Sequence, residues 1–403
     1  MFEENQKPSF SFADLEFQAA PAEKMTEMRE KCPVHYTTNP SAHYTLTRES
    51  DVVKALRDET IWSSEYGPGL AFSKPGTGVL VSSDPPVHTK ERLAISRIFR
   101  PSIINQMEKD IQTVVHEIID SIEKKGNGDL IDDFAAPIPL TVMCWMLGTP
   151  TEDINQFRNW VLPMAEAVAY PDGREASDEV KDAYRNFYTY FGSHIKQRDQ
   201  AINAGIDHPD DLLTRLLTVE NNGEKLTVQN VLGFCQFLLV AGSETTTLMI
   251  GNLLHRLMED PDQLKMLQEN RSLIPNAIEE SLRYDAPVHG LFRTNTSTVT
   301  LHGVEIPSDS KVCMMFGSAN RDPLAWDRPH DFDITRDLAE LRNHTSFGVG
   351  AHYCLGAPLS RLEGSIALSA ILDRLPRIRS NGSPTLTKAG VLKGFSKLPV
   401  RWD

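Results

Sequence analysis

The sequence predicts a mainly α-helical protein with small β-sheets. Apolar residues recur at helical spacing over several long stretches, whereas strand-like alternation is confined to short ones. Residues 298–306 alternate around a His-Gly pair and predict a β-hairpin. Only short strand-like pieces follow residue 372. The helical stretches, in chain order, are 88–99, 103–124, 177–204, 227–259, 276–284 and 355–372.

Composition limits the class of protein. The chain has 403 residues, a length that by itself suggests two or three domains, and a formal net charge of −14, which argues against a nucleic-acid partner. Its five cysteines are odd in number and scattered, which indicates a reduced, cytoplasmic protein. Residues 1–8 are polar and acidic, and no apolar run approaches the roughly 18 residues of a membrane span. We therefore expect neither a signal peptide nor a membrane anchor.

Residues 66–79 are rich in glycine and proline and cannot form a regular element. A structureless segment of this length inside a compact protein is usually functional. The sequence therefore predicts a long functional loop ahead of the first long helix.

The most informative segment is 347–356, which reads Phe-Gly-Val-Gly-Ala-His-Tyr-Cys-Leu-Gly. Its first two glycines permit a tight turn. Cys354 then stands at the start of the predicted helix 355–372, which has Pro358 in its first turn. Unpaired backbone donors and the helix dipole favour a thiolate there, although a lone cysteine is more often a small buried hydrophobe.

The full pattern Phe-x-x-Gly-x-His-x-Cys-x-Gly resembles the haem-binding loop of the cytochrome P450 family. The resemblance implies that Cys354 is the proximal axial ligand of a haem b iron (iron protoporphyrin IX). It also implies that Phe347 packs over the porphyrin and that the amides of Leu355 and Gly356 temper the charge of the sulfur. The expected fold is then the cytochrome P450 fold, a single domain of residues 1–403 that encloses the haem.

A second group of residues fits the same cofactor. On the helix 88–99, His88 and Arg92 share a stripe with Ile95 and Phe99, so two basic side chains face the interior. Buried cations need an anionic partner, unless Arg92 snorkels to solvent or pairs with a protein carboxylate. The resemblance implies that four residues hold the haem propionates: His88, Arg92, Arg293 and His352.

The other side of this helix carries Lys90, Arg97 and Arg100. Such a run is usually only a solvated face. In an acidic protein it also offers a docking surface to an acidic electron donor, and the resemblance suggests a ferredoxin.

The long helix 227–259 contains Ala-Gly-Ser-Glu-Thr-Thr-Thr at its centre, from Ala241 onward. Glycine and threonine weaken a helix, in a way that ordinary core packing would not require. The segment predicts either a kink with Glu244 in a salt bridge or a functional site. The resemblance implies that Ala241 leaves room for dioxygen, that Thr245 hydrogen-bonds it, and that Glu244 relays protons from solvent.

Glu280 and Arg283 lie three residues apart and resemble the Glu-x-x-Arg pair that braces the cysteine loop in this family. The usual third partner is an arginine just before the aromatic of a Pro-x-x-Phe element. In this chain Asp331 stands at that place, and Arg336 is the candidate substitute.

Substrate-facing positions are inferred from the segments that line the pocket in the family. Each of them could equally belong to the core, and together they predict a mostly apolar cavity for a small molecule. His289 could orient a carbonyl or acid group, or could be a hydrogen-bonded loop histidine. The positions are Leu70, Phe72, Phe237, Val288, His289, Leu291 and Leu392.

The resemblance implies a monooxygenase that inserts one atom of O2 into a small, largely apolar organic substrate. Electrons from NAD(P)H would arrive through a ferredoxin-type donor and its reductase, because the sequence has no flavin- or dinucleotide-binding segment. A peroxide-driven peroxygenase and a non-catalytic haem-thiolate sensor are the alternatives. The acid–threonine pair favours the monooxygenase, and a sensor often carries a signalling domain that this sequence lacks.

Overall fold

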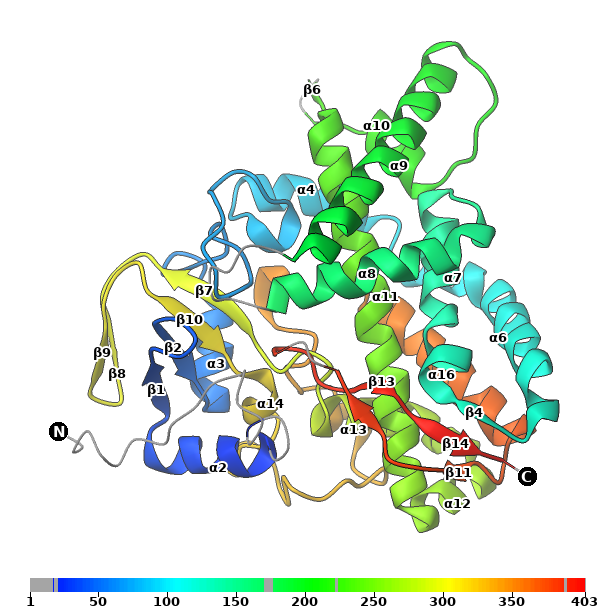
Figure 1. The fold of residues 1–403 in the computed structure, drawn as a ribbon. Helices are drawn as coiled ribbons and strands as arrows, with labels where there is room; N and C mark the ends of the chain where they lie inside the picture. The colour runs from blue at the N-terminus through cyan, green and yellow to red at the C-terminus, as the bar shows by residue number, and fades with distance from the viewer. Residues whose placement is uncertain (1–16, 18–20, 170–176, 222–223, 388–389, 403) are drawn as a thin grey trace.

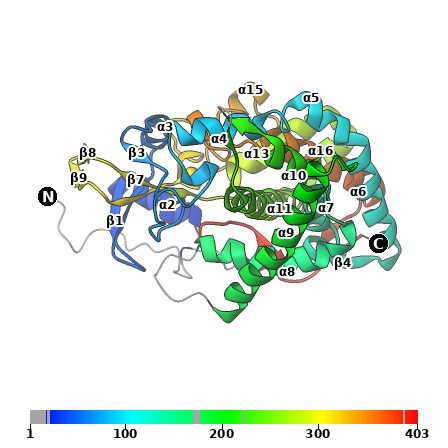
Figure 2. The same cartoon turned by 90° about the horizontal axis from the view of Figure 1, so that it is seen from above.

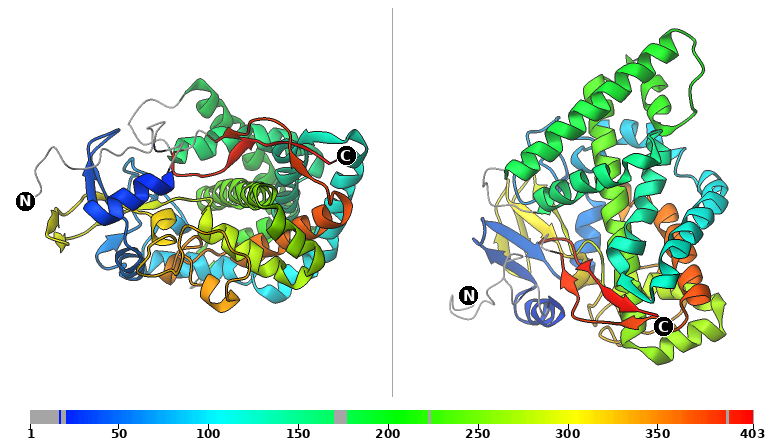
Figure 3. Two further views of the ribbon diagram at one scale, coloured as in Figure 1. Left: turned by 90° about the horizontal axis from the view of Figure 1, so that it is seen from below. Right: turned by 45° about the vertical axis from the view of Figure 1, so that its right-hand side comes forward.

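A computed structural model of the chain describes residues 17, 21–169, 177–221, 224–387 and 390–402. The polar start, residues 1–8, lies outside this range. Helices dominate, and the five-stranded main sheet lies to one side of them (Figure 1). The longest helix, α11 (Val228–Glu259), runs near the middle of the molecule when viewed along its axis (Figures 2 and 3).

Five helices pack most extensively on α11. Because it is surrounded, its most apolar window is 67% buried inside the fold, so that a helix long and apolar enough to cross a membrane serves as a core element. The surrounding helices are α7 (Pro137–Leu147), α8 (Ile154–Ala169), α9 (Asp178–Asn203), α13 (Ile274–Tyr284) and α16 (Ala357–Arg374).

The remaining helices frame this bundle or join it to the sheets. They are α2 (Pro21–Lys31), α3 (Glu49–Arg57), α4 (Val87–Ser96), α5 (Pro101–Ile104), α6 (Glu108–Ile122), α10 (Leu212–Thr218), α12 (Pro261–Glu269), α14 (Phe316–Ala319) and α15 (Leu338–Leu341).

The main sheet has five strands in the order β1-β2-β10-β7-β3. All neighbours in it are antiparallel except β2 and β10, which run parallel. Its strands are β1 (Val34–Thr37), β2 (His43–Leu46), β3 (Trp62–Ser63), β7 (Leu291–Asn295) and β10 (Lys311–Met314). Smaller sheets join β4 (Asn127–Asp129), β11 (Arg379–Ser380) and β14 (Pro399–Arg401); β12 (Thr385–Leu386) and β13 (Phe395–Lys397); β5 (Glu220–Asn221) and β6 (Glu224–Lys225); and β8 (Val299–Leu301) and β9 (Val304–Ile306).

Helix boundaries follow local chemistry. Thr227 caps α11, since its hydroxyl accepts from the Asn230 N–H at 3.1 Å. On α9, residues spaced four apart are buried, which fixes the face that it turns to the core. These are Ala183, Phe187, Phe191 and Ile195.

The predicted hairpin is β8–β9, and its turn places His302 and Gly303 at φ 50° and 76°. The segment 66–79 contains no helix or strand, as expected. The predicted helix 103–124 is wrong as one element, because a 3₁₀ turn at Asn105–Met107 separates α5 from α6. The helix predicted from residue 355 begins later, at Ala357.

The glycine in the middle of α11 has a packing reason that the sequence did not suggest. A Cβ on Gly242 would lie 2.4 Å from the Sδ atom of Met143 on α7, so glycine lets these two helices approach closely. The helix continues without a break through this segment. The hydroxyls of Thr245 and Thr247 donate to the carbonyls one turn earlier, at 2.7 and 3.0 Å.

The Glu280–Arg283 pair is fully buried and doubly bonded, at 2.6 and 2.7 Å. Arg336 completes the expected triad, with its Nε 3.4 Å from Glu280 Oε1. Asp331 leaves the geometry intact, because Arg283 bonds to its backbone carbonyl at 2.8 Å. The Asp331 side chain is 57% exposed and faces Arg328.

We expect Arg336→Ala to lower the free energy of unfolding by about 3 kcal/mol, since it leaves a buried carboxylate with one partner fewer. Asp331→Ala is the matched control and should cost less than about 1 kcal/mol, as surface ion pairs do. Urea midpoints of the two variants test this. Equal losses would show that Arg336 is not the third member of the triad.

Candidate functional site

The cysteine loop is a tight turn set by two glycines. Gly348 and Gly350 have φ of 67° and 77°. A Cβ on Gly350 would lie 2.7 Å from the backbone oxygen of Leu56, so α3 and this turn can approach only at a glycine. The Cys354 N–H donates to the Phe347 carbonyl at 2.8 Å and closes the loop.

The Cys354 sulfur stands just before α16. Burial raises the pKa of its thiol, whereas the N–H groups of Gly356 and Ala357 and the charges of Arg92 and Arg361 lower it. We expected the amides of Leu355 and Gly356 in this role. Gly356 is one of the two residues whose N–H groups lower this pKa, and the role of Leu355 stays a prediction.

A buried ionic group that sequence reasoning missed holds this loop in place. Arg361 on α16 binds both oxygens of Glu279 at 2.5 and 2.9 Å, and His344 Nε2 lies 3.0 Å from Glu279 Oε2. The Arg361 guanidinium also covers the ring of Phe347, 4.5 Å from its centroid. Phe347 is therefore fixed from the side that faces α16.

The pKa of Glu279 reflects this pairing. Burial would raise it, but the hydrogen bonds and charges of Arg361 and His344 outweigh burial and lower it from 4.5 to about 2. A carboxylate whose pKa is lower in the folded state than in the unfolded state stabilises the fold when the pH is above the unfolded-state pKa. This contribution is lost as the pH falls toward the folded-state pKa.

We therefore expect Glu279→Gln to destabilise the protein at pH 7 by roughly 3 kcal/mol. The difference from the wild type should shrink as the pH falls from about 4.5 toward 2, because the wild-type carboxylate then becomes protonated as well. Unfolding midpoints across the acid range measure it. A difference that stays constant with pH would contradict the assigned pairing.

Four basic residues converge near the cysteine loop, as the sequence predicts. The rings of His88 and His352 stack with centroids 3.9 Å apart, and Ser64 Oγ lies 3.1 Å from His352 Nε2. Arg293 on β7 is only 4% exposed. The partly buried Arg92 donates to the Tyr353 carbonyl at 2.7 Å.

This basic cluster, His88, Arg92, Arg293 and His352, lacks an acidic partner. Within the described ranges, none of its members forms an ion pair with a carboxylate. Burial and mutual repulsion lower the pKa of His88 and His352, and burial lowers that of Arg92 and Arg293. Asp84 and Glu59 offset only part of the effect at Arg293.

The two carboxylates of a haem would supply the missing negative charge, and a sulfur at the start of α16 would supply an axial ligand. The residues present therefore fit the group that the sequence predicts. The fit rests on the charge imbalance and on the sulfur environment.

The middle of α11 adjoins this region. Phe237, Ala241 and Thr245 follow one another at four-residue spacing and remain partly exposed, although the helix is central. Glu244 lies with Ser243 and Thr247 on the wall of a cavity of about 110 Å³, opposite Arg158 of α8. Hydroxyl and charged groups thus line a small space next to the segment predicted to bind oxygen.

Some predicted substrate residues come together. Val288 and Leu392 form an isolated β-bridge, and the His289 N–H donates to the Val391 carbonyl at 2.7 Å. Leu70 is buried in the same apolar cluster as Val391, and Leu392 packs against that cluster. Burial, with the charge of Lys393, lowers the pKa of His289 to about 3, so its imidazole is neutral.

Three predicted substrate residues lie elsewhere. Phe72 is 59% exposed, so its position does not fit an enclosed wall; its loop turns it outward, against Tyr66. Leu291 packs on the apolar cluster beneath the main sheet. Phe237 lies on α11, near Ala241.

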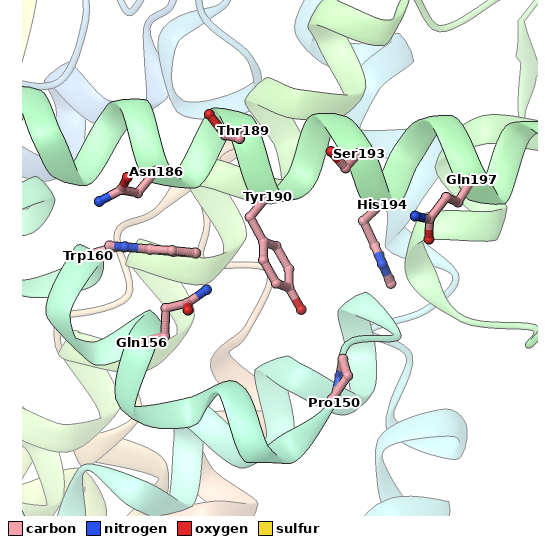
Figure 4. Close-up of a pocket in the computed structure, with 9 residues that line it drawn as sticks. All are labelled: Pro150, Gln156, Trp160, Asn186, Thr189, Tyr190, Ser193, His194 and Gln197. Atoms are coloured by element: carbon pink, nitrogen blue, oxygen red, sulfur yellow. The ribbon is translucent and has the colours of Figure 1, made fainter.

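A wide groove of about 770 Å³ lies apart from these residues, between α8 and α9 (Figure 4). Trp160, Tyr190 and His194 point into the space between the helices, and the Tyr190 hydroxyl donates to Asp153 at 2.6 Å. The groove shares no residue with the predicted haem or substrate positions. Its lining is Pro150, Gln156, Trp160, Asn186, Thr189, Tyr190, Ser193, His194 and Gln197.

Comparison with known proteins points the same way as the geometry. The sequence profile of the cytochrome P450 family matches residues 10–377. Cytochrome P450 109 of Bacillus spizizenii is 34% identical over 378 residues, which cover 93% of this chain and 90% of that protein. The cyclomarin C epoxidase CymV of Salinispora arenicola is 35% identical and covers 89% of this chain and 90% of its own length.

Solved structures agree with this assignment. CYP109E1 of Bacillus megaterium, determined in complex with testosterone, superimposes with a TM-score of 0.86 at 30% identity, over 96% of this chain and 99% of its own. P450BioI, in complex with an acyl carrier protein that bears hexadec-9Z-enoic acid, has a TM-score of 0.87 at 28% identity, over 96% and 100% of the two chains.

Proposed function

Since this chain belongs to the cytochrome P450 family and is a monooxygenase with haem b as cofactor, we propose that it oxidises a small, largely apolar organic substrate. One atom of O2 enters the substrate and the other leaves as water. Electrons would come from NAD(P)H through a ferredoxin-type donor and its reductase. We place the reaction in the cytoplasm, because none of the five cysteines, all within the described residues, forms a disulfide.

One observation carries the proposal: the partly buried Cys354 stands just before α16, near a basic cluster that forms no ion pair with a carboxylate of the described residues. We assign Cys354 as the axial ligand, and His88, Arg92, Arg293 and His352 as the residues that hold the propionates. Bound in this way, a haem-thiolate group supplies the activation of dioxygen. The protein residues bind the group, exclude water and deliver protons.

The substrate proposal rests on Leu70 and Leu392, which belong to one apolar cluster, and on Val288, which forms a β-bridge with Leu392. Two relatives carry bulky organic molecules in their names or titles, cyclomarin C and testosterone. A neutral His289 could donate to or accept from one polar group of such a molecule. We therefore expect substrates that are apolar apart from one such group.

This expectation can be checked by titrating apolar compounds against the ferric enzyme and recording the Soret shift that follows displacement of water. Compounds with a carbonyl or hydroxyl should bind more tightly than their hydrocarbon analogues, by about tenfold for one hydrogen bond. His289→Phe should remove that preference while it retains affinity for the hydrocarbon. An unchanged preference in the variant would exclude His289 as a substrate contact.

Proton delivery is assigned to Thr245 and Glu244. The Thr245 hydroxyl is held by the Ala241 carbonyl at 2.7 Å, which leaves its oxygen free to accept a second hydrogen bond. Glu244 lies on the wall of a cavity that also contains hydroxyl groups of Ser243 and Thr247. Glu244 directly precedes Thr245 on α11, and we assign proton delivery to this carboxylate.

Thr245→Ala should leave substrate binding and haem content unchanged. It should reduce the product formed per NAD(P)H by about tenfold or more, and the electrons that do not form product should appear in hydrogen peroxide. The reason is that no hydroxyl at residue 245 then directs the protons. Thr245→Ser should restore most of the coupling. Full coupling in the alanine variant would refute the relay, and turnover with hydrogen peroxide alone would favour a peroxygenase.

The donor is assigned to the outer face of α4. Lys90 and Leu93 are exposed on α4, where Leu93 is 67% exposed, and Arg97 and Arg100 are exposed just beyond its end. Basic side chains near an exposed leucine suit an acidic partner that carries an apolar contact.

Reversal of Lys90, Arg97 and Arg100 to glutamate should slow reduction by ferredoxin at least tenfold at low salt, and the difference should narrow as salt screens the charges. A matched triple reversal of Arg185, Lys196 and Lys265 changes the net charge equally on other surfaces. Stopped-flow reduction rates compare the two variants. Equal slowing in both would show that overall charge, rather than this face, controls the reaction.

A further inference from the structure

The functional loop, residues 66–79, is attached to the main sheet by a buried lysine. Lys311 is the first residue of β10, and its ammonium donates to the carbonyls of Tyr66 at 2.7 Å and Gly67 at 3.0 Å. The residue is 1% exposed. An ammonium group so deeply buried requires acceptors on every side.

The third donor of this ammonium faces an aromatic ring. Lys311 Nζ lies 5.0 Å from the centroid of the Phe72 ring, within range of a cation–π contact. Phe72 is itself 59% exposed and thus forms a cap between the ammonium and solvent. This contact gives the outward position of Phe72 a physical reason.

The loop folds back on the point where the lysine binds. The Ser73 N–H donates to the Tyr66 carbonyl at 2.9 Å, so this carbonyl accepts from both the loop and the lysine. Gly67 has φ 85°, and a Cβ there would lie 2.4 Å from Ser73 Oγ. Residues 66–73 are therefore one compact turn, closed at its base.

Among the described residues, one backbone–backbone hydrogen bond also joins this turn to the sheet. The Phe292 N–H on β7 donates to the Pro68 carbonyl at 2.8 Å. Lys311 and Phe292 thus hold three consecutive carbonyls, those of residues 66–68, from two neighbouring strands. The next apolar residue, Leu70, is buried beside Val391.

We propose that Lys311 is a positioning residue that pins residues 66–73 to the main sheet and thereby sets the place of Leu70 in the substrate wall. The part that concerns the substrate rests on the proposed function. The pinning itself concerns only contacts within the chain. A methionine could fill the same volume, so the amine is present for the two hydrogen bonds that it donates.

The experiment compares hydrogen exchange of backbone amides in the haem-loaded wild type and in Lys311→Met. The Ser73 and Gly67 amides should exchange about 10- to 100-fold faster in the variant, because the loop loses two charge-assisted hydrogen bonds. The amides of α11 should be unchanged. Lys311→Arg retains charge and donors and should restore most of the protection.

Two further variants separate pinning from general destabilisation. Lys74→Met removes an exposed lysine of the same loop and should leave the exchange rates at their wild-type values. Phe72→Leu removes the aromatic cap at an exposed position, should fold normally, and should speed exchange about 2- to 5-fold. Unchanged exchange in both Phe72→Leu and Lys311→Met would overturn the proposal.

The functional arm measures substrate binding by the Soret shift in the same proteins. Lys311→Met should raise the dissociation constant of an apolar ligand about tenfold, with the haem content and the turnover of bound substrate unchanged. If the amides exchange faster in Lys311→Met but the ligand binds as tightly as in the wild type, Lys311 holds residues 66–73 in place. It then does not affect the substrate wall, and that part of the proposal is overturned. A haem-loaded wild type that gives no Soret shift with any apolar ligand would refute the proposed substrate class and leave the exchange result valid.

Discussion

The central constraint in this protein is a group of basic side chains that form no ion pair. His88 and Arg293 are buried, Arg92 and His352 are partly buried, and the described residues offer no carboxylate within ion-pair distance of them. Burial of an unpaired arginine costs free energy, and burial lowers the pKa of both histidines. We therefore propose that the two propionates of the bound haem complete this group.

Two other groups of buried charges, both on α13, are paired within the chain. Glu280 binds Arg283 and Arg336, and one residue earlier in α13 Glu279 binds Arg361 and His344. The second group fixes α16 and Phe347, and so places the turn that ends at Cys354. The contrast between these satisfied groups and the unsatisfied basic cluster is what makes the cluster informative.

The sequence predicts this architecture where the signal is local. The cysteine motif and the His88–Arg92 stripe are short patterns, and the amphipathic α9 repeats every four residues. Helix α7 escapes prediction because nearly all of its residues are buried, so no polar face gives a period.

Pairings between distant segments are not visible in the sequence either. Arg361 meets Glu279 across 82 residues, and Lys311 meets Gly67 across 244. From the sequence, Arg336 was only a candidate partner for Glu280. The structure shows that Arg336 Nε lies 3.4 Å from Glu280 Oε1. Phe72 was expected in a pocket because it matches a segment that lines the pocket in the family, whereas its ring here lies over the amine of Lys311.

One measurement tests the central claim most directly: the absorption spectrum of the purified, reduced protein under carbon monoxide. Thiolate ligation by Cys354 predicts a Soret band strongly shifted to the red, and Cys354→His should abolish that shift while haem stays bound through the basic cluster. A wild-type spectrum without the shift, or one that survives the substitution, would contradict the account.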